Sequence, residues 1–486
     1  MTNGINKMDE KEKITSSFTL PGKDGKGGVV YFIGIGGIGM SAVARYFSSN
    51  GIKVSGYDKT PTALTEELQK GGIDVHYEEN TTLIPKNADL VVYTPAIPKE
   101  HKELVYYQQN GYPVVKRSDV LQKISESSFN ICIAGTHGKT TISTMIAHLL
   151  RDSGYGCTTF LGGISANYGT NFWSRSSNSN EKNVYVIEAD EYDRSFLKLS
   201  PDMAIITAMD ADHLDIYGTA ESLEDAFIEF SQKVKPGGLL LSKFGLTKGK
   251  ELKADRCLTY SLQNESADVY ASNIRIENGS YEFDVNIGDA GIDKLQLNMG
   301  GMHNVENMVA AIAIASSLEI ESDKIRKAVK IFSGVKRRFE YIIKNDRLVF
   351  IDDYAHHPEE LKALITGAKT LFRQRRCTVI FQPHLYTRTR DFANGFAEAL
   401  DMADEVVLLP IYPARELPLE GVNSELILNK MKLKNKEVMS KEEVISRLQN
   451  EYEKKMNKEF GEILITAGAG DIDALVQPVK KFLESV

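Results

Sequence analysis

The stretch FNICIAGTHGKTTISTMIAHLLRDSG, which begins at Phe129, constrains the fold of this chain more than any other segment. An apolar run that predicts a strand leads into the turn GTHGKTT, and apolar residues at helical spacing follow. The backbone N–H groups of such a turn can wrap phosphate oxygens, while Lys139 reaches the terminal phosphates and the Thr140 hydroxyl ligates Mg²⁺. The usual G-x-x-x-x-G-K-[ST] spacing would place a glycine at Ile133, so the motif is shortened here. Strand, loop and helix in this order still predict a phosphate-binding α/β domain.

Acidic residues for a metal ion are expected at the end of a neighbouring strand, and VYVIEADEYD supplies them. We assign the metal to Glu188 and expect Asp190 and Glu191 to be solvated, although spacing alone does not choose among the three. His213 follows the next predicted strand, in MDADHLDIYG. A histidine beside acids is by itself more often a surface residue, but this position makes His213 a candidate ligand. Because Mg²⁺ prefers oxygen, a histidine ligand indicates a second divalent site that also accepts Mn²⁺.

A second glycine-rich turn, GIGGIG, lies about one hundred residues earlier, between a predicted strand and a predicted helix. Asp58 ends the next predicted strand, 19 residues after Gly39. Taken alone, this arrangement predicts a dinucleotide fold with NAD as the usual ligand. Any diphosphate fits the same turn, however, and a tight turn without a ligand is the alternative. The candidate residues for this ligand are Gly34, Gly36, Gly37, Gly39 and Asp58.

The length of 486 residues is too great for one ordinary core and predicts roughly three domains. Repeated alternation of apolar strands with helices predicts three α/β domains in series: a Rossmann-like N-terminal domain, a central P-loop ATPase domain and a C-terminal Rossmann-like domain. The predicted boundaries are a flexible lead-in at 1–26 and domains at 27–125, 126–336 and 337–486. Alternating patterns between about 255 and 300 predict an antiparallel edge or insertion.

Composition argues against some classes of binding partner and indicates the cellular compartment. The net charge is −8 and the basic residues are dispersed, which argues against nucleic acid as a partner. No apolar run approaches the roughly 20 residues that cross a bilayer, and the polar N-terminal segment lacks a signal-peptide core. We therefore expect a cytoplasmic protein without membrane insertion, as a monomer or weak homodimer. The 4 cysteines form no C-x-x-C pair and are expected to be buried free thiols.

Nine motifs in a fixed order resemble those of the Mur ligase family, which acts in bacterial cell-wall (peptidoglycan) synthesis. They are GIGGIGMSA, GTHGKTT, EADEYD, DHLDIY, HNVENMVAA, GVKRRFE, DDYAHHP, QPHLYTRTRD and GAGDID. The resemblance implies an N-terminal domain that binds a UDP-sugar, a central ATPase domain, and a C-terminal domain that closes over ATP and positions an amino acid. It also implies an ATP-dependent ligase that joins the lactyl carboxylate of UDP-N-acetylmuramate to L-alanine through an acyl phosphate.

The resemblance also implies a role for individual residues. ATP would be bound by Gly135, Thr136, His137, Gly138, Lys139, Thr140, Thr141, Asn304, Asn307, Arg338 and Asp353. The metal ligands would be Thr140, Glu188 and His213, and the catalytic set would be Lys139, Glu188, His213, Arg338 and Asp353. His357, His384 and Arg388 would form the L-alanine pocket, with Arg388 binding the carboxylate through a bidentate bond. The base that deprotonates L-alanine is left open among His357, His384 and Asp353.

Two departures and three alternatives accompany this interpretation. Relatives commonly have Thr-Asn where this chain has Thr207-Ala208, and many carry arginine at Leu385. The first alternative is the relative that attaches a murein tripeptide to the same UDP-sugar, although GIGGIGMSA follows the alanine-adding type. The second is an NAD-dependent oxidoreductase built on GIGGIG and Asp58, which leaves GTHGKTT and the third domain unexplained. The third is a non-catalytic nucleotide-binding regulator.

Overall fold

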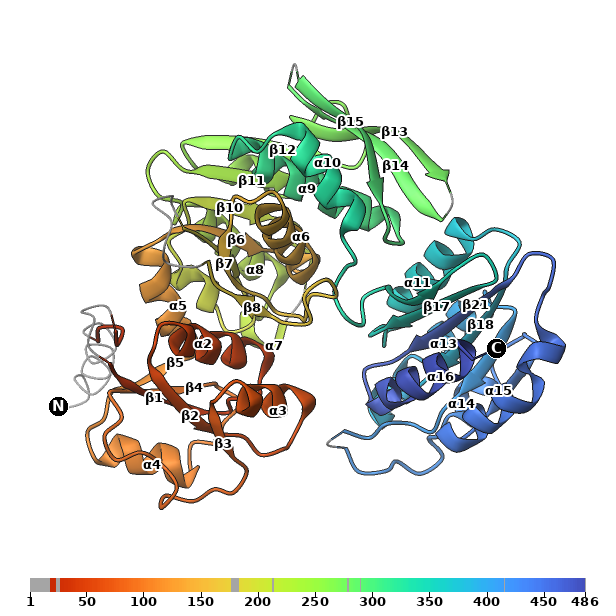
Figure 1. Ribbon diagram of the computed structural model, residues 1–486, viewed down its shortest axis with the longest axis horizontal. Coiled ribbons are helices and arrows are strands. Elements are labelled where there is room, and N and C mark those ends of the chain that lie inside the picture. The colour runs from red at the N-terminus through yellow and green to blue at the C-terminus, as the bar shows by residue number, and fades with distance from the viewer. Residues whose placement is uncertain are drawn as a thin grey trace, which may run out of the picture. The chain divides into compact units, whose positions relative to one another are not determined.

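The computed structural model describes residues 18–22, 27–175, 183–211, 214–277, 279–288, 290–414 and 416–485. The chain divides into two compact units, each of which is described by itself. Unit 1 comprises the described residues up to Ile164 together with Thr170–Val269 and Ala310–Lys324. Unit 2 comprises Ser165–Gly169, Tyr270–Val309 and the described residues from Ile325 onward. Three sheets follow one another along the chain (Figure 1), which confirms the prediction of three α/β domains in series.

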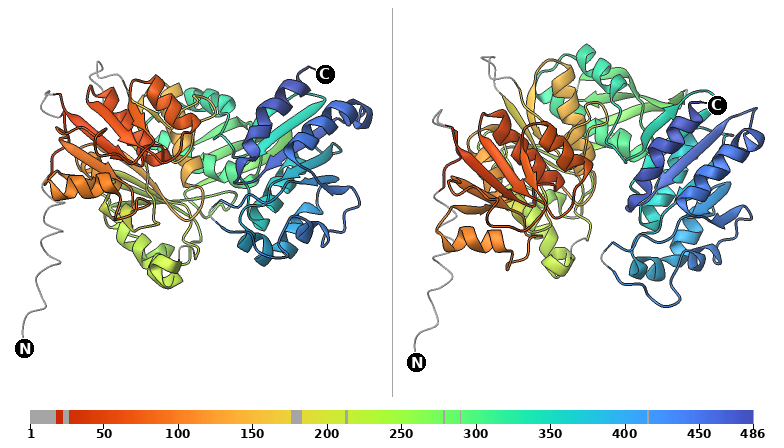
Figure 2. Two further views of the ribbon diagram at one scale, coloured as in Figure 1. Left: turned by 90° about the horizontal axis from the view of Figure 1, so that it is seen from below. Right: turned by 60° about the horizontal axis from the view of Figure 1, so that its bottom comes forward.

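The N-terminal sheet has the strand order β3-β2-β1-β4-β5, and all of its strand pairs are parallel. Its strands are β1 (Val29–Ile33), β2 (Lys53–Tyr57), β3 (Asp74–His76), β4 (Leu90–Tyr93) and β5 (Val114–Lys116). The helices α2 (Ile38–Ser49), α3 (Ala63–Lys70) and α5 (Arg117–Glu126) contribute buried residues to one hydrophobic cluster, and α4 (Lys102–Gln109) contributes to another. Figure 2 shows helices on both faces of this sheet. The strand order reverses between β1 and β4, and ligands of open α/β sheets bind at such a point. The turn GIGGIG follows β1 at this point.

The central sheet of unit 1 has the order β12-β11-β10-β6-β9-β7-β8. Its strands are β6 (Phe129–Ala134), β7 (Cys157–Phe160), β8 (Phe172–Trp173), β9 (Val184–Glu188), β10 (Met203–Ile206), β11 (Leu239–Lys243) and β12 (Arg256–Ser261). All of these pairs are parallel except β7 with β8. Because β6 lies between β10 and β9, the residues that follow these three strands meet at one edge of the sheet. The helices of this part are α6 (Lys139–Asp152), α7 (Leu214–Tyr217) and α8 (Ala220–Ser231), and α9 (Met302–Ser317) enters it from unit 2.

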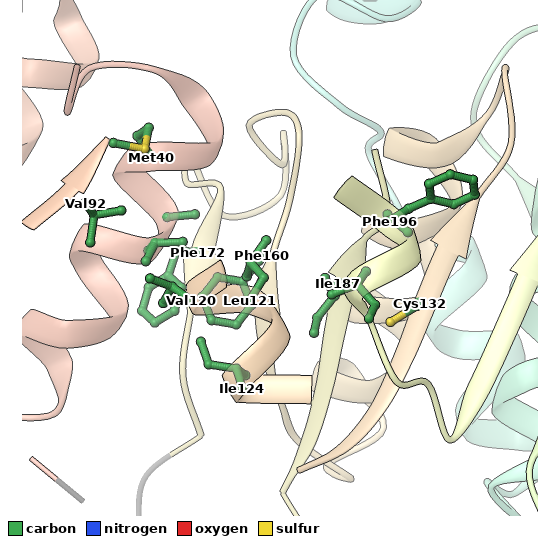
Figure 3. Packing of buried hydrophobic residues seen from close by; sticks show 14 of the residues in the cluster. Met40, Val92, Val120, Leu121, Ile124, Cys132, Phe160, Phe172, Ile187 and Phe196 are labelled. Carbon is green, nitrogen blue, oxygen red and sulfur yellow. The ribbon is translucent and has the colours of Figure 1, made fainter. Parts of the chain in front are cut away.

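One hydrophobic cluster joins the N-terminal and central parts of unit 1 (Figure 3). Val120, Leu121 and Ile124 of α5 lie in it together with Phe160 of β7 and Phe172 of β8. Full burial of one such side chain contributes about 1.5–3 kcal/mol, so this shared core fixes α5 between the two sheets.

Unit 2 contains an antiparallel hairpin and the C-terminal sheet. The hairpin strands are β14 (Ser280–Ile287) and β15 (Ala290–Leu297), preceded by β13 (Val269–Glu277). This pairing confirms the predicted antiparallel edge, although β12, in the same stretch of sequence, pairs parallel with β11. The C-terminal sheet has the order β16-β17-β21-β18-β19-β20, and only β16 is antiparallel.

Unit 2 also contains the strands of the C-terminal sheet and the helices that follow α9. The strands are β16 (Glu340–Lys344), β17 (Leu348–Asp353), β18 (Arg376–Phe381), β19 (Glu405–Leu408), β20 (Lys436–Val438) and β21 (Glu462–Ala467). The helices are α10 (Ser322–Ile331), α11 (Pro358–Leu371), α12 (Tyr386–Asp391), α13 (Ala393–Leu400), α14 (Glu425–Leu428), α15 (Lys441–Lys455) and α16 (Val476–Leu483).

The structure also bears on the expected absence of membrane spans, on the N-terminal lead-in and on the cysteines. Every helix within the described ranges is too short or too polar to span a bilayer. Of the predicted lead-in, only 18–22 are described, and Leu20 is buried there. All four cysteines are free, but the prediction of burial is wrong for Cys257, which is exposed on β12, where it lies next to the strand's exposed first residue.

Candidate active site

The phosphate loop lies between β6 and α6 and rests on the residues that follow β10. Gly135 adopts φ +131° and Gly138 adopts φ +83°, both of which favour glycine. The N–H of Thr136 donates to the Ala208 carbonyl at 3.2 Å, and the Thr207 hydroxyl donates to the His137 carbonyl. A Cβ at Gly135 would lie 2.1 Å from Oγ1 of Thr207. The loop is therefore shaped by close contact with Thr207-Ala208.

Lys139, the first residue of α6, is held inside this loop. Its Nζ donates to the Gly135 carbonyl and to Oε1 of Glu191, both at 2.7 Å. Glu191 is fully buried, so the expectation that it is solvated is wrong. Burial raises the pKa of the Glu191 carboxyl, and the Lys139 ammonium opposes that rise. Glu191 is thus a functional candidate that the sequence reasoning missed, because a run of acids gives no sign that one of them turns inward.

The predicted metal ligands Thr140 and Glu188 contact each other. The Thr140 hydroxyl donates to Oε1 of Glu188 at 2.9 Å, and the N–H of Gly162 donates to Oε2 at 2.9 Å. A hydroxyl and a carboxylate are hard oxygen donors, so the pair fits Mg²⁺, which often binds one or two carboxylates plus substrate phosphates. His213 lies outside the described residues. Elsewhere in the described ranges, no group of three His, Cys, Asp or Glu residues converges as a metal site.

The loop also fits a bound phosphate chain. Oγ1 of Thr136 is buried and has no hydrogen-bond partner within the described part of the chain, so it can accept or donate a bond to a ligand. The first turn of α6 carries no acidic residue, and its N–H groups point toward the loop. Thr141 is buried in the same turn, whereas His137 is exposed at the tip of the loop. These features suit an anion with several oxygens.

The first glycine turn is fixed to the end of β2. The N–H groups of Gly34 and Ile35 donate to the Tyr57 carbonyl at 2.8 and 2.9 Å. Oδ2 of Asp58 accepts from the N–H of Gly36 at 2.7 Å, so the acid that the sequence suggested for a ligand here supports the turn itself. Gly37 is the N-cap of α2 and has no side-chain cap, and Gly39 lies in the first turn of that helix.

In unit 2, the candidate nucleotide residues lie around the strand β17 and the start of α9. Asp353 ends β17, and its carboxylate accepts from the N–H groups of Phe339 at 2.6 Å and Ala355 at 2.7 Å. Arg338 is exposed in the turn that precedes β16. The side chain of Asn304 donates to the Gly300 carbonyl at 2.6 Å and accepts from that of Asn307 at 3.2 Å.

His384 and Arg388, two of the three candidates for the amino-acid pocket, lie together at α12. The Nη1 atom of Arg388 is 3.5 Å from Nδ1 of His384, and the ring of Tyr412 stacks on His384 with centroids 5.8 Å apart. Partial burial and the neighbouring Arg388 and His356 lower the pKa of His384. The His384 imidazole is therefore neutral at pH 7.

The third candidate, His357, has a structural role. Its ring caps α11 by accepting from the N–H of Glu359 at 3.4 Å, and it packs against Phe392 with centroids 4.8 Å apart. The ring that lies near His384 is that of His356, at 6.3 Å between centroids, a residue that the sequence reasoning did not choose. Adjacent histidines point in different directions. Pro358 and Glu360, the first and third residues of α11, are a sequence signal for His357 as the cap, and the sequence reasoning did not use it.

The buried carboxyls of Asp352 and Asp353 should make the stability of the fold depend on pH. Burial raises the pKa of both carboxyls to about 6, above the ordinary value of 3.8. Between about pH 4 and 6 the folded state keeps protons that the unfolded state releases, so these groups stabilise the fold at low pH and the contribution is lost as pH rises through 6. From pH 4 to pH 7, the free energy of unfolding of the wild type should fall by about 2 kcal/mol more than that of the variant Asp352→Asn. Urea unfolding at these pH values measures the free energy of unfolding of both proteins. The same change with pH in the wild type and in the variant would contradict the prediction.

The loop at the carboxyl end of the inner strand β6 places this chain in the class of phosphate-loop α/β proteins. Three family models match it in series: the Mur ligase family catalytic domain over 29–128, the Mur ligase middle domain over 133–315, and the Mur ligase glutamate ligase domain over 337–470. The chain belongs to the Mur ligase family and is a ligase, as the order of its motifs indicated.

Individual relatives match almost the whole chain. Those from Flavobacterium johnsoniae and Parabacteroides distasonis, both named UDP-N-acetylmuramate–L-alanine ligase, are 47% and 48% identical to it. Each match covers 93% of this chain and 97% of the relative. The solved structure of the UDP-N-acetylmuramate–alanine ligase of Thermotoga maritima matches with a TM-score of 0.78 and 29% identity, over 94% of this chain and 100% of that one.

Proposed function

We propose that this chain joins L-alanine to the lactyl carboxylate of UDP-N-acetylmuramate, with ATP as the phosphoryl donor and Mg²⁺ as the metal, in the cytoplasmic part of peptidoglycan synthesis. The observation that carries the proposal is identity of 47–48% to relatives of that name over 93% of this chain, which includes all three domains. The phosphate loop and its oxygen ligands support the nucleotide and the metal. The NAD-dependent alternative has no support among these relatives, and it leaves the phosphate loop and the third domain unexplained.

Phosphoryl transfer to a carboxylate requires two anions to meet, so the main task of the site is to neutralise charge. Lys139 and the amides of the loop would contact the β- and γ-phosphates, and Glu191 would hold the lysine in place through its bond to Nζ at 2.7 Å. Thr140 and Glu188 would hold the metal, which supplies positive charge to the phosphate oxygens when bound. The acyl phosphate that forms would then be open to attack by an amine.

L-Alanine arrives as an ammonium ion and must lose a proton before it attacks. A neutral imidazole can accept that proton, and the lowered pKa of His384 suits this role. Arg388 lies 3.5 Å from the same ring and could bind the alanine carboxylate through its guanidinium. We therefore prefer His384 over His357 as the base, since His357 serves as the helix cap.

An assay of phosphate release tests the proposal. Purified protein is incubated with UDP-N-acetylmuramate, ATP and Mg²⁺, and with L-alanine, L-serine, glycine or the murein tripeptide in separate reactions. We expect release of phosphate and a product of the mass of the L-alanyl sugar with L-alanine, and with Mn²⁺ in place of Mg²⁺ as well. Absence of phosphate release with L-alanine contradicts the proposal, and turnover with the tripeptide alone supports the other ligase.

A further inference from the structure

Arg117, the first residue of α5, extends its side chain over the first glycine turn. A Cβ on Gly39 would lie 2.6 Å from Nη1 of Arg117 and 3.0 Å from its Cζ, so the guanidinium occupies the space that a larger residue would need. Gly39 lies in the first turn of α2, a helix of 12 residues with no acidic residue in that turn and no side-chain cap. The sequence reasoning explained the glycine by close approach of a ligand, whereas the structure places an arginine against it.

The guanidinium has few partners for its five N–H donors. Its closest charged neighbour is Asp190, with 3.8 Å between Nη2 and Oδ2, which is too long for a hydrogen bond. Within the described ranges, the Arg117 side chain makes no hydrogen bond, and it is 26% exposed. A guanidinium fork in this state can bind two oxygens of a ligand.

The position of Arg117 is fixed by the helix that carries it. Val120, Leu121 and Ile124 anchor α5 in the cluster that joins the two sheets of unit 1 (Figure 3). The same first turn is held by Asp119, which accepts from the N–H of Lys116 at 2.8 Å. The first turn of α2 is fixed as well, because Asn171 donates from its side chain to the Ile38 carbonyl at 2.5 Å.

A small cavity lies between Arg117 and the acidic segment that follows β9. A cavity of about 10 Å³, with room for about one water molecule, is lined by Arg117, Glu188, Asp190 and Ser195 among others. Arg117 therefore contacts the space above Gly39 and also lines a cavity with Glu188, the carboxylate that would hold the metal. This position suits contact with a substrate that carries a diphosphate at the first turn and a reacting carboxylate near Glu188.

We propose that Arg117 is a substrate-binding residue whose guanidinium contacts the diphosphate of the UDP-sugar beside the first turn of α2. This inference rests on the proposed function for the identity of the sugar nucleotide. The glycine turn and the helix amides contribute partial charges, and Arg117 adds the full positive charge and the paired donors that a diphosphate requires. Asp190 keeps the guanidinium oriented while the site is without ligand and gives way to the stronger diphosphate contact.

A comparison of the affinities for UDP and for uridine separates the contribution of the diphosphate from that of the nucleoside. Isothermal titration calorimetry is performed with the wild type, with Arg117→Gln, and with Lys123→Gln, a control on the same helix that pairs with Glu126 at 3.0 Å. We expect Arg117→Gln to lose about tenfold to a hundredfold in UDP affinity and to keep the uridine affinity of the wild type. The control variant Lys123→Gln should have the same affinity as the wild type for UDP and for uridine. The KM for UDP-N-acetylmuramate should rise by a similar factor while the KM for ATP stays unchanged.

Gly39→Ala provides a second test without removal of charge. The new methyl group would push the end of the flexible Arg117 side chain aside, so UDP affinity should fall, and the double variant should lose no more than Arg117→Gln alone. Equal losses for UDP and uridine in Arg117→Gln, or a lower melting temperature with unchanged UDP affinity, would overturn the inference. If the wild type forms no product with L-alanine but the UDP results are as expected, the proposed function fails and the role of Arg117 stands.

Discussion

Replacement of Lys139 by alanine is expected to lower kcat by about 10³-fold and to leave the affinity for the UDP-sugar unchanged. In the proposed mechanism the lysine supplies positive charge to the transferred phosphate, whereas the UDP-sugar binds at the first glycine turn. The same change should lower stability, because Glu191 is fully buried and its carboxylate would lose its cation. Breaking a buried ion pair in this way costs about 3–5 kcal/mol. The loss should be greater at pH 8 than at pH 6, since a buried carboxyl without a cation takes up a proton at the lower pH.

The double variant Lys139→Ala with Glu191→Gln separates catalysis from folding. Glutamine removes the buried charge that Lys139 neutralised, so the midpoint of urea unfolding should return toward that of the wild type. Phosphate release should remain at the level of the single variant. Lys233→Ala is a matched control, since this lysine is partly exposed and forms an ion pair with Glu229, which is also exposed, at 3.3 Å. Recovery of turnover in the double variant would show that Lys139 acts only on stability.

The strands and the main loop could be predicted because local signals determine them. FNICIA is β6 to the residue, since a parallel strand that is buried on both faces is mostly apolar; its one polar residue, Asn130, is buried and donates to the Ser125 carbonyl at 2.9 Å. The contact between Thr140 and Glu188 followed from the rule that parallel strands end at a common edge, and the two side chains are 2.9 Å apart. These inferences need only the order of strands and turns.

Interactions between distant residues could not be predicted. The Glu191 carboxylate is buried because Lys139, 52 residues away, neutralises it, and an acidic run looks the same whether it faces solvent or a lysine. Pro358 and Glu360, the first and third residues of α11, mark His357 as the cap, but no local pattern shows that the ring of His356 lies near His384, 28 residues away. The role of Arg117 was missed for the same reason, since Gly39 matches the glycine motif whether a ligand or an arginine lies against it.

Gly135→Ala should have the second largest effect, because it breaks the contact on which the short loop depends. The new Cβ would lie 2.1 Å from Oγ1 of Thr207 and 2.8 Å from the backbone nitrogen of Ala208, and φ of +131° is strained for alanine. Overpacking of this kind costs about 1–3 kcal/mol, and the strained backbone adds to it. Since the loop must move away from β10, we expect kcat to fall by about 10²-fold, as a displacement of about 1 Å at a reacting group can do.

Gly154→Ala is the matched control for Gly135→Ala, because this glycine also has positive φ, +82°, but has nothing within 4 Å of its Cβ position among the described residues. It should cost about 1–2 kcal/mol of stability and leave kcat unchanged. Thr207→Ala combined with Gly135→Ala removes the 2.1 Å contact but keeps the 2.8 Å contact with backbone, so it should recover stability only in part. Equal effects of Gly135→Ala and Gly154→Ala on kcat and unfolding would show that backbone strain alone matters. A larger loss at Gly135 would instead mean that the loop is short because it must lie directly on the end of β10.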